Sequence, residues 1–331
     1  MLLLLYWFLM SIYAFILFGV DKARAKNNGR RIPEKKLLTI SALGGAIGSG
    51  LAMLIFHHKT KKERFTKKVP VFIALTVFVA AGCFYLNLHI TVTEHEYVGA
   101  DVPQNLDGFR IVQVSDLHNQ FFGFREKALI DRIADLSPDI IVVTGDVVDK
   151  NFTNYKLAYR FFEGAVSIAP VYYVTGNHEA WLSGSRLEKF LQSIEELGVI
   201  MMDNRKVTAG GLTIIGIADE SLRRPPEELK NEDGFTICLA HEPMYYERYR
   251  ALGADVAFVG HVHGGQVIIP KKGGVISPDL EFFPDLYAGA HVYGEGDDSM
   301  TMYISRGLGN SVLPLRINNF PELLVVTLRH Q

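Results

Sequence analysis

Long uninterrupted apolar runs dominate the first ninety residues of the chain. Residues 2–20 carry no charged side chain, and residues 69–90 form a second uncharged run of similar length. A helix of about 20 residues crosses a hydrocarbon core of about 30 Å, so both runs are predicted to span a membrane. A cleaved signal peptide is the less favoured interpretation of the first run, because no small-residue cleavage pattern follows it.

A third apolar run, residues 37–56, contains four glycines, Gly44, Gly45, Gly48 and Gly50. Small residues allow close helix packing in a bilayer, and they equally allow a re-entrant bend that is buried against protein. The sequence leaves both interpretations of this run open.

Basic residues flank the third run on both sides. Residues 21–36 contain seven Lys and Arg and residues 57–68 contain six, and short basic loops tend to stay in the cytoplasm. If both loops stay inside, the third run does not fully cross and the chain after residue 90 is extracytoplasmic. Three crossings that start inside give the same result, whereas three that start outside place that part in the cytoplasm. We expect the external arrangement; binding of anionic lipid headgroups is an alternative use of the same charge.

The pattern changes at residue 91, where apolar and polar residues begin to alternate. Strand-like runs are predicted at 91–98, 109–114, 140–144, 171–175, 212–217, 235–240, 256–259 and 300–305, and helical patterns at 125–136, 155–166 and 185–197. This alternation indicates an α/β layered sheet with helices outside. We therefore divide the chain into an all-α transmembrane domain, residues 1–90, and an α/β domain, residues 91–331.

The net charge of −2 hides an asymmetry between these two parts. Residues 1–90 hold 13 of the 34 Lys and Arg and 3 of the 36 Asp and Glu, a charge of +10 that leaves −12 for the rest. The negative balance argues against nucleic acid as a partner of the second domain. The two cysteines, Cys83 and Cys238, lie in apolar runs and are predicted to be buried thiols.

Polar side chains gather where predicted strands of the second domain end, in the blocks SDLH, TGDVVD, TGNHE, LAH and GHVH. Ligands of open α/β sheets collect at the carboxyl ends of strands, and oxygen and imidazole donors suit a divalent metal. A glycine before three of these donors is expected to let the backbone turn sharply. The candidate metal ligands are Asp116, His118, Asp146, Asn177, His241, His261 and His263.

In this order, DLH, GDVVD, GNHE, an isolated histidine and GHVH resemble the calcineurin-like metallophosphoesterase family over about residues 88–328. The resemblance implies a two-sheet α/β sandwich with two divalent metal ions, one held by Asp116, His118, Asp146 and His263, the other by Asp146, Asn177, His241 and His261. The blocks GHVHGGQ, SRGLGNSVLPLR and PELLVVTL resemble the membrane-associated YkuE/YaeI-like branch, some relatives of which cleave UDP-2,3-diacylglucosamine. Residues 2–80 resemble the membrane domain DUF1294, which implies no chemistry.

Two cations about 3.5–4 Å apart would bind phosphate oxygens and share a water whose pKa falls to about 7. The resulting hydroxide attacks phosphorus in line with the leaving oxygen, without a Ser or Cys nucleophile. His178 is the candidate to protonate the leaving group or to stabilise its charge, and Asp149 to accept the other ring N–H of His178. A structural histidine and a helix cap are the alternatives. The mixed donor set admits Mn, Fe, Zn or Co.

Further side chains are candidates for contacts to a substrate. Gln266 could hydrogen-bond it, and Arg306 and Arg316 could neutralise a second phosphate, with a tight turn and salt bridges as the alternatives. The candidates for an apolar wall against an acyl chain, with core packing as the alternative, are Phe282, Phe283, Tyr287 and Tyr293.

The sequence therefore predicts a binuclear metal-dependent phosphoesterase anchored in the cell membrane. Because the second domain follows the last apolar run without a long linker, we expect a phosphodiester or diphosphate of a lipid headgroup as its substrate. A nuclease or nucleotide phosphodiesterase is one alternative, and a non-catalytic metal-binding membrane sensor is another. The presence of His178 beside a full ligand set disfavours the sensor.

Overall fold

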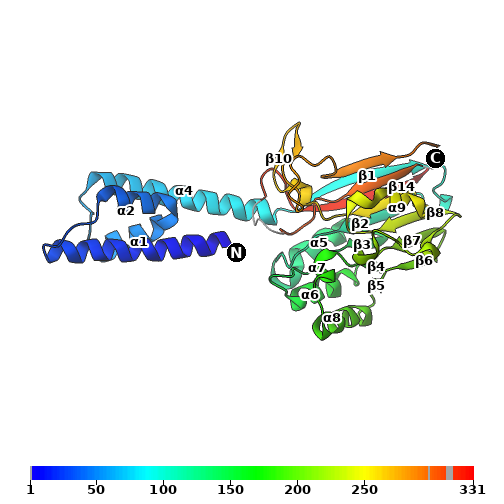
Figure 1. Ribbon diagram of the computed structural model, residues 1–331, viewed down its shortest axis with the longest axis horizontal. Coiled ribbons are helices and arrows are strands. Elements are labelled where there is room, and N and C mark those ends of the chain that lie inside the picture. The colour runs from blue at the N-terminus through cyan, green and yellow to red at the C-terminus, as the bar shows by residue number, and fades with distance from the viewer. Residues whose placement is uncertain (1, 297–298, 311–315) are drawn as a thin grey trace. The chain divides into compact units, whose positions relative to one another are not determined.

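The structure is a computed structural model that describes residues 2–296, 299–310 and 316–331 (Figure 1). The chain forms two compact units, Met1–Tyr85 and Leu86–Gln331. The described residues of the first unit form helices, whereas those of the second unit form strands and helices.

The first unit is built from α1 (Leu2–Lys26), α2 (Glu34–Ile40), a π-helical turn (Ser41–Gly45), α3 (Ala46–Ile55) and α4 (Glu63–Leu88). Three helical segments within the described residues are long and apolar enough to cross a membrane: Leu5–Lys26, Glu34–Ile55 and Glu63–Leu88. They coincide with the three apolar runs of the sequence.

The middle segment bends sharply between α2 and α3. Gly44 has a φ of 105°, which favours glycine, and the hydroxyl oxygens of Ser41 and Ser49 lie 2.7 Å apart across the bend. Gly48 faces α1 so closely that a β-carbon there would lie 1.8 Å from the carbonyl oxygen of Ser11. The glycines thus permit both a turn and a close helix contact.

Both ends of the bent segment lie beside one buried carboxylate, that of Asp21 near the end of α1. Asp21 accepts hydrogen bonds from the Ile32 N–H at 2.9 Å and from the Arg31 guanidinium, both just before α2. His58, just after α3, places Nε2 at 2.7 Å from the same carboxylate. Since α2 leads away from this end and α3 returns to it, the segment is a hairpin, although it is long enough to cross a bilayer.

Two six-stranded sheets form the centre of the second unit. Strands of the first sheet, in spatial order, are β1 (Thr91–Gly99), β14 (Glu322–His330), β2 (Arg110–Val114), β3 (Ile140–Thr144), β4 (Val171–Val174) and β5 (Ile200–Met201). Strands of the second are β12 (Gly289–Tyr293), β13 (Met300–Ile304), β9 (Val256–Val259), β8 (Phe235–Leu239), β7 (Leu212–Gly216) and β6 (Arg205–Ala209). A short hairpin, β10 (Ile268–Ile269) with β11 (Gly273–Gly274), lies outside both sheets.

Helices cover the outer faces of both sheets (Figure 1). They are α5 (Lys127–Asp135), α6 (Tyr155–Ala165), α7 (Asn177–Ala180), α8 (Ser185–Glu196) and α9 (Tyr246–Ala251). Side chains alternate across a strand, so Val112 and Val143 pack with α5, α6 and α8, whereas Ile111 and Val142 pack against the second sheet. These layers confirm the predicted two-sheet α/β sandwich with helices outside.

Parallel pairing of β2, β3 and β4, and of β7, β8 and β9, gathers the carboxyl ends of these strands. Each predicted strand agrees with an observed one to within about a residue or two at each end, which is also the range by which definitions of strand ends differ. The predictions missed the two-residue strands β5, β10 and β11 and the longer strands β6, β12 and β14. Of these, β14 lies between β1 and β2 and pairs with both, so it completes the middle of the first sheet.

Candidate metal centre

Every candidate ligand lies directly after the carboxyl end of a strand, where it is at most 7% exposed. Asp116 and His118 follow β2, Asp146 follows β3, Asn177 begins α7 after β4, His241 follows β8, and His261 and His263 follow β9. The structure brings all seven together in one buried site, while their role as ligands stays a prediction.

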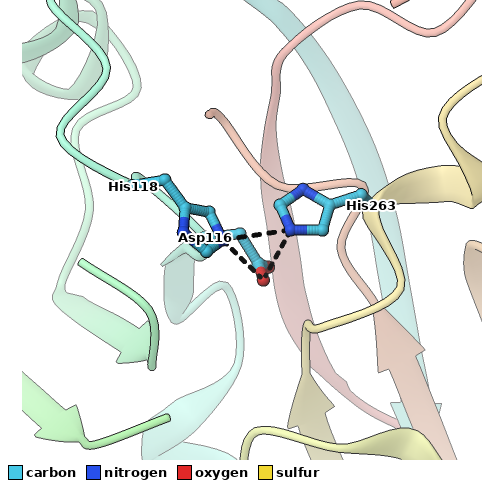
Figure 2. A group of neighbouring side chains, drawn as sticks. All are labelled: Asp116, His118 and His263. Atoms are coloured by element: carbon cyan, nitrogen blue, oxygen red, sulfur yellow. Dashed lines mark hydrogen bonds and ion pairs between the residues drawn. The ribbon is translucent and has the colours of Figure 1, made fainter. Parts of the chain in front are cut away.

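The first group of donors comes from two loops. Figure 2 shows the side chains of Asp116, His118 and His263 pointing toward one another. His118 Nε2 lies 3.0 Å from His263 Nε2, and Asp116 Oδ1 lies 4.0 Å and 3.6 Å from these two nitrogens. Asp146 Oδ2 lies 3.4 Å from His118 Nε2 and completes the group.

The same oxygen, Asp146 Oδ2, belongs to a second group of donors. It lies 3.3 Å from His241 Nε2, and Asn177 Oδ1 lies 2.9 Å from that nitrogen and 3.2 Å from His261 Nδ1. The other oxygen, Asp146 Oδ1, accepts a hydrogen bond from the backbone N–H of His178 at 2.8 Å. The two groups therefore share one carboxylate oxygen, as the family resemblance implies.

Hydrogen bonds at the outer edge of two rings decide which ring nitrogen carries the proton. His241 Nδ1 lies 2.8 Å from the Thr144 carbonyl oxygen, and His261 Nε2 lies 3.2 Å from Asp279 Oδ2. Carbonyl and ionised carboxylate oxygens only accept, so these outer nitrogens carry the ring protons. The inner nitrogens of both rings then present lone pairs to the site, as in metal-binding histidines.

In one part of the site, lone pairs consequently face a lone pair. In their neutral forms, the inner nitrogens of His241 and His261 face the amide oxygen of Asn177. Buried acceptors held this closely are unfavourable unless a cation or a proton lies between them. The Arg316 guanidinium donates to His263 Nδ1 at 3.4 Å, so a neutral His263 carries its proton on Nε2, which lies 3.0 Å from His118 Nε2. Separations near 3 Å are those of neighbouring ligands around a cation with bonds of about 2.0–2.2 Å. The residues present thus fit a divalent metal centre.

The backbone of the ligand loops is strained. Five of the seven candidate ligands have a positive φ: Asp116 (52°), His118 (44°), Asp146 (53°), His261 (69°) and His263 (49°). Residues other than glycine rarely adopt this region, and such strain, about 1–3 kcal/mol per residue, clusters at functional sites. The strain is therefore consistent with a site that is selected for function rather than for stability.

The three glycines that precede ligands do not all act as expected. Gly145 has a φ of +84°, which provides the sharp turn before Asp146. Gly176 has an ordinary φ of −106°, but a β-carbon there would lie 2.4 Å from Asp146 Oδ1. A β-carbon at Gly260 would likewise lie 2.4 Å from Asp116 Oδ2. The expectation of a sharp turn is correct at Gly145. The other two glycines instead leave space for the carboxylates of Asp146 and Asp116.

Burial and neighbouring charges set the protonation states of the donors. Although burial raises the pKa of Asp146, the surrounding histidines, His241 foremost, lower it well below the usual range. Burial, with the charges of His118 and Arg316, lowers the pKa of His263. An ionised carboxylate and a neutral imidazole, as in Asp146 and His263, are the forms that bind a cation. Although burial lowers the pKa of His118 and of His241, the neighbouring carboxylates raise both, so a bound cation would take the place of a proton on these two rings.

His178 lies beside the shared carboxylate, with Nε2 at 4.0 Å from Asp146 Oδ2. On its other side, the Lys150 N–H donates to His178 Nδ1 at 3.2 Å. The neutral ring therefore carries its proton on Nε2, which faces the donors. Burial lowers the pKa of His178 to about 4, so the ring is neutral at physiological pH.

Asp149 lies between two rings rather than beside one. Its Oδ2 is 3.5 Å from His178 Nδ1 and 3.6 Å from His118 Nδ1, while Oδ1 accepts two backbone N–H groups. Because the Lys150 N–H already occupies His178 Nδ1, the ring of His118 is the better partner for this carboxylate. The structure thus favours His118 over the predicted His178 as the ring that Asp149 orients.

Glu179 is a buried carboxylate that our sequence reasoning missed. It accepts three backbone N–H groups, those of Asp146 at 2.8 Å, Val148 at 2.9 Å and Gly176 at 2.9 Å. These bonds tie the loop after β3 to the start of α7. Burial and the charge of Asp146 raise the pKa of Glu179 to about 7. Its place in the GNHE block was the available signal, whereas nothing in the sequence links Asp279 to His261.

The polar candidates for substrate contacts are engaged within the protein. Arg306 forms an ion pair with Glu322 at 2.7 Å, and the Arg316 guanidinium donates to the carbonyl oxygens of Arg306 and Gly309. Gln266 is buried, and its Oε1 has no hydrogen-bond partner among the described residues. The salt-bridge alternative therefore describes Arg306. Arg316 is instead buried, with its guanidinium 3.4 Å from His263 Nδ1, and no salt bridge of it is seen among the described residues.

The aromatic candidates separate into two pairs. Phe282 and Phe283 are 70% and 51% exposed, whereas Tyr287 is half-buried and Tyr293 stacks on Tyr246 with ring centroids 3.9 Å apart. The two phenylalanines alone, of these four, present large exposed surfaces.

Comparison with protein families identifies two matches. Residues 109–265 match the family described as "Calcineurin-like phosphoesterase", and residues 11–65 match "Protein of unknown function (DUF1294)". The donors of the site lie within the first of these matches.

Curated proteins similar to this chain carry metallophosphoesterase names. The "Uncharacterized metallophosphoesterase YkuE" of Bacillus subtilis (strain 168) is 29% identical over 82% of this chain and 98% of its own length. The "Phosphodiesterase YaeI" of Escherichia coli (strain K12) is 27% identical over 68% of this chain and 83% of its own. The "Transmembrane protein with metallophosphoesterase domain" of Danio rerio is 23% identical over 80% of this chain and 63% of its own length.

Proposed function

We propose a function from the premise that this chain carries a calcineurin-like metallophosphoesterase domain and is a metal-dependent hydrolase of phosphoric esters. The proposed reaction is hydrolysis of a phosphodiester or diphosphate with two divalent cations, one in each donor group. The shared oxygen carries this proposal: Asp146 Oδ2 lies 3.4 Å from His118 Nε2 and 3.3 Å from His241 Nε2. One carboxylate oxygen between two donor groups suits a two-metal site.

Bound divalent cations supply Lewis acidity toward phosphate oxygens and acidify a water molecule. The chain itself holds the metal-binding side chains and provides a hydrogen-bond donor to the leaving group. The Ser115 hydroxyl donates to Asp116 Oδ2 at 2.6 Å, which fixes this carboxylate so that Oδ1 faces His263. His178 is neutral and carries its proton on Nε2, so it is placed to donate a hydrogen bond to the leaving oxygen and to stabilise the charge that develops there.

Turnover of bis-p-nitrophenyl phosphate by the full-length protein with added Mn²⁺ tests the reaction. Asp146→Asn is expected to abolish turnover, and His178→Ala to lower kcat by about 10²–10⁴-fold. Two variants outside the site are matched controls: Asp131→Asn, an exposed side chain of α5, and His291→Ala on β12. Both are expected to retain the wild-type rate. Unchanged rates in the two site variants would refute the assignment.

The substrate that we propose is a phosphorylated lipid. Three helical segments are apolar enough to cross a membrane, and a similar curated protein is named a transmembrane protein. Only two residues separate the end of α4 at Leu88 from the start of β1 at Thr91, a span of at most about 10 Å. Lipid extracts from cells with the wild-type protein or with Asp146→Asn test this proposal, because the variant should accumulate a headgroup phosphodiester or diphosphate.

The proposed topology rests on the hairpin of the first unit. Both basic loops lie at the end of that unit where Asp21 binds Arg31 and lies beside His58. Short loops rich in Lys and Arg stay in the cytoplasm, so α1 and α4 cross the cell membrane and the hairpin does not. The metallophosphoesterase domain then lies on the extracytoplasmic side.

A further inference from the structure

A small ladder of short strands projects from the second unit around β10 (Figure 1). β10 pairs with β11, and two isolated bridges extend the ladder, one between Val267 and Ile317 and one between Ile276 and Phe282. Residues 267–283 together with Ile317 are called the flap below. None of the proposed metal ligands or proton donors lies in it.

The flap is attached directly to the donor site. The carbonyl oxygen of Gly265, two residues after His263, accepts the N–H groups of Val275 at 3.2 Å and Ile276 at 3.1 Å. In addition, Asp279 Oδ2 lies 3.2 Å from His261 Nε2. The flap therefore contacts the chain two residues after one candidate ligand, His263, and contacts a second one, His261, directly.

The flap exposes large apolar side chains to solvent. The exposed fractions of these side chains are 71% for Leu280, 70% for Phe282, 51% for Phe283, 44% for Ile317 and 38% for Ile269. Five exposed large apolar side chains on one small element are unusual for a surface in contact with water, and such a concentration is of the kind that marks an interaction surface. These five side chains are called the patch below. Two exposed lysines, Lys271 and Lys272, occupy the turn between β10 and β11.

The patch lies close to the point where the chain leaves α4. Phe320, three residues after Ile317, packs its ring 5.5 Å from the ring of His89, and the Pro321 carbonyl oxygen accepts the Thr91 N–H at 2.8 Å. Three residues span at most about 11 Å. His89 directly follows the last turn of α4, so the flap is connected through Phe320 to the residue at which the chain leaves the proposed membrane-spanning helix.

We propose that the flap dips its apolar side chains into the surface of the bilayer that holds α4, and thereby brings a lipid headgroup phosphate to the donor site. This inference rests on the proposed function, which supplies the membrane and the lipid substrate. Apolar side chains at such an interface lie about 5–10 Å deep at the headgroup–acyl boundary. Lys271 and Lys272 are suited to anionic headgroups at the same level. The flap also carries two exposed acidic residues beside Leu280, Asp279 and Glu281, so its charges balance and the five apolar side chains carry the proposed contact with the bilayer.

A fluorescent label on the flap tests the contact without any turnover. Full-length protein with Cys83→Ser and either Leu280→Cys or Phe282→Cys is labelled with a nitrobenzoxadiazole dye, because the remaining native thiol, Cys238, is buried. The protein is placed in nanodiscs of phosphatidylethanolamine and phosphatidylglycerol. Doxyl-lipid quenching at both flap positions is expected to be at least about twofold stronger than at Val292→Cys, with less iodide quenching. Val292, 69% exposed on β12, is the matched control.

Weak doxyl-lipid quenching together with strong iodide quenching, equal at the flap positions and at position 292, would overturn the flap proposal. Protection from iodide without doxyl quenching would also overturn it, because that result indicates a protein partner instead of a bilayer. Bis-p-nitrophenyl phosphate turnover by the unlabelled wild type is measured on the same nanodiscs. Its absence would contradict the proposed function, whereas the label readings do not depend on catalysis, so the two failures are distinguishable.

Discussion

Asp279 holds the outer nitrogen of His261 at 3.2 Å, although it lies on the flap and not in any ligand loop. The carboxylate keeps the ring proton on Nε2, which leaves the Nδ1 lone pair for a cation. In Asp279→Asn the amide is uncharged and can also present N–H to the ring, which would favour the wrong tautomer. We expect the affinity for Mn²⁺ to fall by about 10–100-fold, measured by calorimetric titration of the full-length protein.

Asp285→Asn is the matched control for that measurement, because Asp285 is an exposed aspartate of the same region. Its Mn²⁺ affinity should equal that of the wild type. If Asp279→Asn also binds like the wild type, then Asp279 does not orient His261.

Glu126 is another buried carboxylate, which follows the candidate ligand His118 in the chain, and it accepts the backbone N–H of Phe122 at 2.9 Å. Burial raises its pKa from 4.5 to about 7. Between these values the folded chain binds more protons than the unfolded chain, so stability falls as the pH rises through this window. Glu126→Gln keeps the acceptor and removes the charge. We expect it to stabilise the protein at pH 8 by up to about 3 kcal/mol and much less at pH 5.

Thermal unfolding of the two proteins at both pH values measures this difference. Glu163→Gln, at an exposed glutamate that pairs with Arg125, should show little change with pH. A gain for Glu126→Gln that is equal at pH 5 and pH 8 would mean that ionisation of this residue does not destabilise the fold.

Single residues also show how far a sequence alone leads. Asp116, Asp146 and His261 were predicted as neighbours because each follows a buried strand, and parallel strands end at one edge. Their positive φ angles could not be predicted, because the surrounding packing imposes them against local preference. The contact between His261 and Asp279 depends on the folding of the flap, which has no periodic pattern of its own.

At the scale of elements, most of the strands that were predicted are buried on both faces, such as β3 and β8, whereas β1 was predicted from its alternation of apolar and polar residues. Their apolar runs differ clearly from helices because they are short and end in glycine or polar residues. β6 and β12 were missed because their exposed positions interrupt the apolar pattern. The pairing of β14 with β1 and β2 is a long-range arrangement that local sequence does not encode.

The hairpin of the first unit depends on a close contact between α3 and α1. Gly48→Ala is expected to destabilise this unit by about 1–3 kcal/mol, because the new methyl group would meet the backbone of Ser11. Gly82→Ala in α4 is the matched control, since nothing lies within 4 Å of the added carbon. Thermal unfolding of the full-length protein in detergent measures both. Equal stability of the two variants would contradict the packing of the hairpin.

At the scale of the whole molecule, the proposed membrane topology depends on whether the glycine-rich segment turns back as a hairpin. A segment that turns back at Gly44 contributes no crossing, so the loops before α2 and after α3 share one side. A segment that crosses would separate these two loops. Charge supports the first arrangement, because both loops are rich in Lys and Arg.

Cysteine labelling with a membrane-impermeant maleimide in intact spheroplasts separates these arrangements. In a Cys83→Ser background, Lys189→Cys on exposed α8 should react at once, whereas Asn28→Cys and Thr60→Cys, one in each basic loop, should react only after permeabilisation. Reaction of only one of the two loop positions would show that the glycine-rich segment crosses the bilayer. Reaction of both loops before Lys189→Cys would keep the hairpin but reverse the orientation. The two loop positions test the fold of the first unit, and the third tests the side on which phosphoester hydrolysis takes place.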